Sequence, residues 1–295
     1  MKTPAPPATT ALSDSTKRVS IAKSGLRLLD RLVGWLTEIP AGLLVLTEIL
    51  VLLAGVVSRY VFHQPLTWSD ELASTLFLWL AMLGSVIAVR RSSHMRMTAL
   101  VDIASPSLRT FLDLFAVTAA LTFLVVLGHP AYEFAYEEAV VTSPTLEISN
   151  AWRAGALPIG IGFMALSSFI KLAETTSWKH LIAAVATSLG AVAVVVAASP
   201  LFQNLGNLNL FIFFVVIVAV LVLSGVPIAF AFGLATLGYI SLTTTKPTVV
   251  IVGRMDEGMA HIVLLAVPLF VFLGVVLELS GMAKAMVRFL ASLLG

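Results

Sequence analysis

Cysteine is absent from this 295-residue chain, and charged residues make up only 12% of it. A soluble domain carries about 25% charged residues. The absence of cysteine excludes disulfides, thiolate metal sites and a cysteine nucleophile. Hydrophobic residues reach 59%, and the mean hydropathy is +1.01. This composition is typical of a protein whose main solvent is lipid rather than water.

Charge and motifs exclude two further classes of protein. The net charge is only +2 at pH 7, and the basic residues cluster beside apolar segments, as membrane topology alone would produce, so no nucleic-acid partner is expected. The polar cluster of His129, Glu133 and Glu137 has neither an HExxH motif nor paired catalytic residues, and no Walker phosphate loop occurs. We therefore expect neither an enzyme nor an ATPase, and no bound cofactor.

Long apolar segments dominate what is present. A membrane span needs about 20 apolar residues, since the hydrocarbon layer is ~30 Å thick. Seven segments qualify, and an eighth is interrupted: 41–62, 69–89, 109–128, 156–172, 181–199, 208–224, 227–243 and 260–279. The predicted fold class is an all-α integral membrane protein.

The first 40 residues differ in composition from the rest. Residues 1–16, rich in Pro, Thr, Ala and Ser, are expected to be disordered. Residues 17–38 fit either an amphipathic helix at the membrane interface or a simple flank of the first span. The apolar run begins too far into the chain for a signal peptide, so residues 1–40 are assigned to a tail and an interfacial helix.

The distribution of Lys and Arg predicts the orientation, because short basic loops stay in the cytoplasm. Basic residues mark the N-terminus, the second loop and the fourth loop. The third loop is acidic, and residues 199–209 carry no charge. We expect a multi-pass protein of the bacterial inner membrane with a cytoplasmic N-terminus, and with residues 129–155 in the periplasm.

A polar, turn-forming stretch near residue 200 divides the chain into two modules. Residues 41–180 are expected to form a four-helix module whose two ends lie in the cytoplasm. Residues 181–204 would then be a connector helix and linker that bring the chain back outside. Residues 205–295 form the second module.

Ionisable residues inside the spans are scarce, and each is a candidate for function because a charge in lipid is costly. Glu48 lies within the first span, and its carboxyl could make a polar contact between helices or reach water or lipid headgroups. Asp70 and Glu71 open the second span, where carboxylates also complement the helix dipole. Asp113 lies near the start of the third span.

The segment 58–102 carries the most specific pattern in the first module. Its marker residues are Arg59, Tyr60, Pro65, Trp68, Glu71, Trp79, Gly84, Arg90 and His94. In order and spacing they resemble the small membrane subunit of the tripartite ATP-independent periplasmic (TRAP) transporters. Trp68 and Arg90 are about 22 residues or ~33 Å apart along a helix, which suits anchors at opposite membrane surfaces. The resemblance implies scaffold and anchoring roles for Arg59, Trp68, Glu71, Trp79, Arg90 and His94. A metal site or proton relay is the alternative for His94, but in a cytoplasmic loop with three arginines we expect it to face headgroups or solvent.

The second module resembles the beginning of the large TRAP membrane subunit. Three fragments carry this resemblance: 224–230 (SGVPIAF), 266–274 (AVPLFVFLG) and 280–283 (SGMA). Pro227 and Pro268 predict broken or re-entrant helices, because proline lacks an amide hydrogen and clashes within a helix. Such breaks expose backbone groups that can bind substrate and ions; the alternative for either proline is a packing kink with no ligand. The hairpin residues Pro268, Gly274, Ser280 and Gly281 are the predicted transport and ion region.

The resemblance also implies a function. A fused small and large permease of this family would take part in sodium-coupled uptake of an organic acid, of the carboxylate or sialic-acid type, delivered by a periplasmic binding protein. The large module would move the substrate by an elevator-like displacement against a fixed scaffold formed by the small module and connector. The alternative is a non-transporting membrane scaffold or assembly subunit.

The second module holds only about 90 residues, fewer than the family's large subunit. We therefore expect a fragment or a split subunit that needs the remainder of the large subunit as a partner. Lacking those neighbours, residues 245–295 should be the least stably packed part of the chain.

Overall fold

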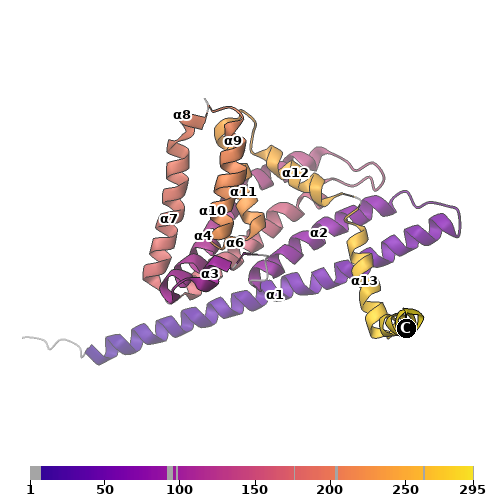
Figure 1. Cartoon of the computed structure of the whole chain (residues 1–295), viewed down its shortest axis with the longest axis horizontal. Coiled ribbons are helices and arrows are strands. Elements are labelled where there is room, and N and C mark those ends of the chain that lie inside the picture. The colour runs from indigo at the N-terminus through magenta and orange to yellow at the C-terminus, as the bar shows by residue number, and fades with distance from the viewer. Residues whose placement is uncertain are drawn as a thin grey trace, which may run out of the picture.

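The chain folds into helices joined by short connections (Figure 1). The computed structural model describes residues 8–91, 96–97, 99–175, 177–202, 205–261 and 263–294, with the backbone alone for 8–24, 99–100 and 294. Helices account for 82% of the chain, and the β pairing found in the described part is one isolated bridge between Thr142 and Ser149. The predicted all-α class is confirmed.

Sixteen helical elements follow one another along the described chain. Their bounds are α1 Ala8–Tyr60, α2 Ser69–Arg90, α3 Ala99–Ile103, α4 Pro106–Glu137, η1 Glu138–Val140, α5 Ala151–Ala154, α6 Ala156–Glu174, α7 Trp178–Ala197, α8 Ser199–Phe202, α9 Leu208–Phe211, η2 Ile212–Ile217, α10 Val218–Leu223, α11 Ile228–Thr243, α12 Val249–Met259, α13 Ala266–Leu279 and α14 Met282–Leu294.

Five helices of the described chain are long and apolar enough to cross a membrane. They are Gly25–Tyr60, Ser69–Arg90, Pro106–Val140, Ala151–Glu174 and Trp178–Ala197. The bent pair α13 and α14 adds a sixth if it counts as one span, and two shorter apolar helices cover Leu208–Leu223 and Ile228–Thr243. Each of the eight predicted apolar segments therefore overlaps a helix.

The N-terminal prediction needs correction, because α1 runs without interruption from Ala8 to Tyr60. Residues 8–16, expected to be disordered, are helical, while residues 1–7 lie outside the described part. Residues 17–38 are continuous with the first span in one helix, as expected of a flank of that span, and are not separated from it by a break. No proline occurs between Pro7 and Pro40, so nothing in that interval blocks helix growth, and Pro40 removes just one hydrogen bond from a 53-residue helix.

One hydrophobic core joins the two predicted modules. It combines buried side chains of α2, α4 and α6 with those of α11 and α12. Glycines allow close helix contacts in it, as is common in membranes: a Cβ on Gly160 would lie 2.6 Å from Met82, and one on Gly233 would lie 2.6 Å from Phe123. The rings of Phe123 and Phe230 meet edge to face with centroids 5.9 Å apart. The start of the second module is thus part of the same packed body.

The last three helices differ in packing: α12 is packed against the body, whereas α13 and α14 are exposed. Helix α12 buries Ile251, Val252 and Asp256 against α4 and α2, so the expectation of loose packing from residue 245 is wrong for this helix. Ile251, Val252, Met255 and Met259 share one face of α12 and reach the common core, whereas Val250 is exposed. Helices α13 and α14 instead project from the body, as Figure 1 shows, and nearly all of their described side chains are exposed.

Candidate functional site

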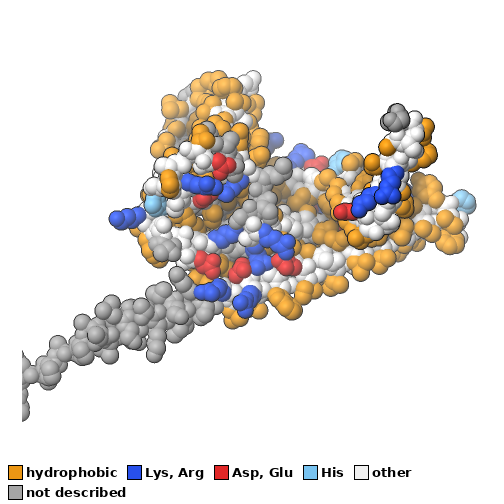
Figure 2. All heavy atoms as spheres, turned by 60° about the horizontal axis from the view of Figure 1, so that its bottom comes forward, with side chains coloured by type: hydrophobic (Ala, Val, Ile, Leu, Met, Phe, Trp, Pro, Cys, Tyr) orange, Lys and Arg blue, Asp and Glu red, His pale blue; other side chains and the backbone are white. Residues whose placement is uncertain are grey.

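Arg90 lies across α1 and binds two of its acidic residues. Its Nε and Nη2 donate to the two carboxylate oxygens of Asp30, each at 3.0 Å, and its Nη1 donates to Glu38 at 3.3 Å. Gly34 lies between these acids, and a Cβ there would come within 2.6 Å of Arg90 Nη1. Because Asp30, Gly34 and Glu38 are four residues apart, they lie on one face of α1, and the Arg90 guanidinium packs against that face. Charged side chains gather over the middle of the face in Figure 2.

The other ends of α1 and α2 meet through a second ion pair. Arg59 Nη2 lies 3.3 Å from Asp70 Oδ2, and both side chains are about half exposed. Trp68 precedes α2 as its N-cap residue and is 38% exposed. The two predicted anchors Arg59 and Trp68 thus lie at the opposite end of α2 from Arg90.

Two further predicted residues attach α2 to the connection between α4 and α6. Glu71 Oε2 accepts hydrogen bonds from the backbone N–H of Thr145, at 2.8 Å, and from the Thr145 hydroxyl. Trp79 Nε1 donates to the carbonyl oxygen of Trp152 at 2.8 Å. The structure therefore gives both residues fixed partners from distant sequence, whereas His94 lies outside the described residues.

A mostly buried ion pair joins the two modules. Arg153 Nη2 of α5 donates to Asp256 Oδ2 of α12 at 2.8 Å, and the side chains are 23% and 12% exposed. Burial raises the pKa of the Asp256 carboxyl; Arg153 opposes this and the nearby Glu138 carboxylate adds to it. Arg153 Nε and Asp256 Oδ1 are buried without a hydrogen-bond partner in the described chain. The pair therefore depends on one strong contact.

The predicted transport region occupies both ends of α13 rather than one cluster. Pro268 is buried in the first turn of α13, and the chain is not helical before it, at residues 260–261 and 263–265. Ser280 and Gly281 form the 73° bend between α13 and α14, ~18 Å along the helix from Pro268. Gly281 has a φ of +73°, and Gly274 faces open space. The second break is at Gly281, while Pro227 separates α10 from α11 as predicted.

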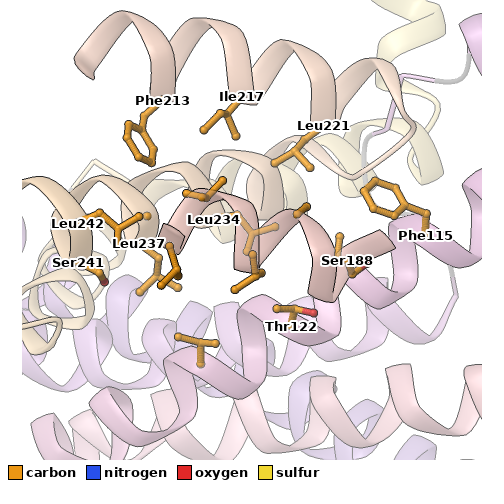
Figure 3. Close-up of a pocket in the computed structure, with 17 residues that line it drawn as sticks. Phe115, Thr122, Ser188, Phe213, Ile217, Leu221, Leu234, Leu237, Ser241 and Leu242 are labelled. Carbon is orange, nitrogen blue, oxygen red and sulfur yellow. The ribbon is translucent and has the colours of Figure 1, made fainter. Parts of the chain in front are cut away.

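An apolar cavity of about 310 Å³ lies where the connector helix α7 meets both modules (Figure 3). Side chains from α4, α7, η2, α10 and α11 line it, and all seventeen lining residues are uncharged. The Thr122 hydroxyl is already bonded to the Thr118 carbonyl, and the Ser188 hydroxyl is buried without a partner in the described chain. Such a lining suits a hydrocarbon group rather than an ion or an acidic substrate.

The sequence analysis did not predict that Arg90 binds Asp30 and Glu38, nor that Arg153 pairs with Asp256. Two acids on either side of a glycine, at Asp30, Gly34 and Glu38, could have predicted a binding site for an arginine side chain on this face of α1. Asp256 gave no such signal, because α12 was not expected at all, and its partner is 103 residues away.

The chain resembles one protein family over both modules. The model of the "Tripartite ATP-independent periplasmic transporters, DctQ component" matches residues 48–178, and that of the "Tripartite ATP-independent periplasmic transporter, DctM component" matches residues 215–295. These matches fall on either side of the connector helix α7.

Curated relatives show the same order. The sialic acid TRAP transporter permease protein SiaT of Haemophilus influenzae is 26% identical over 92% of this chain and 45% of its own length. The small permease protein SiaQ of Vibrio cholerae is 31% identical over 50% of this chain and 85% of its own length. The isethionate TRAP transporter permease protein DctMQ of Oleidesulfovibrio alaskensis is 25% identical over 77% of this chain and 36% of its own length.

The chain thus spans less than half the length of SiaT and of DctMQ, but most of the length of the small permease SiaQ. These relatives are transport proteins and not enzymes. With both component models matched in order on one polypeptide, the chain belongs to the TRAP transporter family as a fused small and large permease.

Proposed function

We propose that this chain is the membrane permease component of a sodium-coupled system that takes up an organic acid across the bacterial inner membrane. The substrate class is a carboxylate or sialic-acid type, delivered by a periplasmic binding protein. Support comes from the relatives, which are named for sialic acid, C4-dicarboxylates and isethionate. All of these are organic acids.

Within this system, the first module, α7 and the helices up to α12 serve as the fixed scaffold. The observation that carries this role is the Arg153–Asp256 ion pair together with the core shared by both modules. Moving α12 away from α4 and α5 would open that core and leave the mostly buried charges of Arg153 and Asp256 without a partner. A rigid body of this kind supplies the fixed surface that an elevator movement requires.

The exposed pair α13 and α14 leads toward the moving part. The helix break just before α13, which Pro268 follows in the first turn, and the bend at Ser280–Gly281 interrupt regular helix bonding at the two ends of α13. We assign the coupling ion and substrate to this hairpin and to the remainder of the large permease subunit, which this chain needs as a partner. Membrane lipids would contact the apolar outer faces, and the N-terminus would lie in the cytoplasm.

Transport in proteoliposomes tests the proposal. The chain would be reconstituted with the remaining large-permease part, and candidate binding proteins with labelled organic acids would be added outside. We expect accumulation that requires both the binding protein and an inward sodium gradient, and that stops when potassium replaces sodium. Accumulation without a sodium gradient would contradict the coupling, and no uptake of any organic acid would favour the scaffold alternative.

A further inference from the structure

Glu48 on α1 is a buried carboxyl without a polar partner in the described chain. Its side chain is fully buried, and neither carboxyl oxygen has a hydrogen-bond partner. The contact between helices that the sequence allowed is therefore not made. Other acids on this helix are engaged: Asp30 and Glu38 both bind Arg90.

Glu48 lies midway between the two ionic layers that bracket α1. Glu38 belongs to the Arg90 layer, and Arg59 pairs with Asp70 at the other end. With a rise of 1.5 Å per residue, Glu48 is ~15 Å from the level of Glu38 and ~16 Å from that of Arg59. The near edges of the two layers, at Glu38 and Arg59, are therefore ~31 Å apart, close to the thickness of the hydrocarbon layer. Glu48 lies near its centre.

The residue of α2 that lies level with Glu48 is apolar. Helices α1 and α2 run antiparallel in close contact (Figure 1). Gly34 contacts Arg90, and Gly55 contacts Ser69. Glu48 is the fourteenth residue after Gly34, and Leu76 is the fourteenth residue before Arg90. Glu48 and Leu76 therefore lie at the same level of the helix pair. Next to Leu76, the Thr75 hydroxyl already donates to the carbonyl of Glu71 at 3.1 Å.

Charged groups on the neighbouring helices lie at helix ends and are engaged or exposed. Helix α1 packs against α2, α6 and α13. On α2, Asp70, Glu71 and Arg90 have the partners described above. On α6, Lys171 donates to the Val89 carbonyl and Glu174 is exposed, and on α13 Glu278 is exposed. None of these groups makes a hydrogen bond or ion pair with Glu48.

We propose that Glu48 is a proton-binding site: its carboxyl carries a proton at neutral pH in the folded protein. An ionised carboxylate without a counter-ion in an apolar environment costs several kcal/mol, and the group avoids that cost by staying neutral. Releasing the proton would place a charge between α1 and α2 near the membrane centre. Alkaline pH therefore loosens this helix pair, which gives the small-permease module a sensitivity to pH.

Infrared spectroscopy of the purified chain in lipid tests the proposal directly. A protonated carboxyl has a carbonyl stretch well separated from the carboxylate bands, and it shifts when hydrogen is exchanged for deuterium. At neutral pH we expect this band in the wild type, and we expect Glu48→Gln to remove it. The control Glu174→Gln, which changes an exposed carboxyl, should leave the band in place.

Two results would overturn the proposal. One is a wild-type spectrum at neutral pH without a protonated-carboxyl band, which would mean that internal water or a cation keeps Glu48 ionised. The other is a band that persists in Glu48→Gln. If that variant fails to fold, Glu48→Asp serves instead, because it should shift the same band in frequency; an unshifted band would then count against the proposal. The test requires no transport activity and is independent of the proposed function.

Discussion

At the scale of single residues, the geometry of Arg90 depends on a planar guanidinium. Arg90→Lys keeps the charge but cannot bind both oxygens of Asp30, so we expect a loss of about 1–3 kcal/mol in unfolding free energy. Arg91→Lys is the matched control, because Arg91 is 64% exposed and makes one contact to Glu38. Thermal unfolding in detergent would compare the two. Equal losses of stability in the two variants would mean that the bidentate contact of Arg90 with Asp30 adds no stability of its own.

The inter-module ion pair supports a second prediction at this scale. Arg153→Gln removes the counter-charge of the mostly buried Asp256 carboxylate, so we expect destabilisation of about 3 kcal/mol. Arg254→Gln alters the exposed Arg254–Glu257 pair and should change stability by less than about 1 kcal/mol. If the two variants unfold at the same temperature, the Arg153–Asp256 pair does not hold α12 in place.

The pH dependence of this pair has a defined sign. Because burial raises the pKa of Asp256, the folded state holds this proton to higher pH than the unfolded chain does. Stability therefore falls as pH rises from the unfolded carboxyl pKa of about 4 to the folded value, and is level above it. Unfolding temperature against pH, compared between wild type and Asp256→Asn, would measure this. A wild-type stability that rises relative to the variant over the same interval would contradict it.

At the scale of elements, the bend between α13 and α14 rests on Gly281. Its φ of +73° lies in the left-handed region, so Gly281→Ala should cost about 1 kcal/mol and open the bend. Gly274→Ala, in open space inside α13, should leave the bend unchanged. Spin labels on Cys substitutions at Val271 and Phe289 would report the distance between the two helices. An unchanged distance distribution in Gly281→Ala would argue against this role for Gly281.

The helices themselves were largely predictable, and their partners were not. Apolar length alone gave the positions of α2, α4, α6 and α7, because lipid requires about 20 such residues per span. Helix α12 was missed because its 11 residues are too few for a span and its mixed composition resembles a loop. Contacts such as Trp79 to Trp152 depend on tertiary packing, which no local pattern encodes. For the same reason the break near α13 was placed at Pro268, whereas the structure has breaks on either side of that helix.

At the scale of the whole molecule, the distribution of Lys and Arg predicts the orientation. Glu138 and Thr175 should lie on opposite sides of the membrane, with Glu138 in the periplasm. Since the chain contains no cysteine, single Cys substitutions at these two positions can be labelled with an impermeant thiol reagent in intact cells. We expect labelling at position 138 and protection at position 175 until the cells are opened. Labelling of both positions from outside would refute the four-span arrangement of the first module.

The central claim is that both modules form one fixed body up to α12, and a cross-link between α4 and α12 tests it most directly. A Cβ on Gly253 would lie 3.5 Å from the Phe134 ring. Cys substitutions at Phe134 and Gly253, joined by a short bifunctional thiol reagent, should therefore cross-link in high yield. Each single Cys variant, treated with the same reagent, is the control.

The cross-linked protein would then be reconstituted with the remaining large-permease part and a binding protein. We expect sodium-driven uptake of the organic acid at a rate close to that of the untreated double variant, because α4 and α12 do not separate during transport. Uptake that is abolished by the cross-link and restored by cleaving it would contradict the account, since it would show that α12 moves relative to the small-permease module.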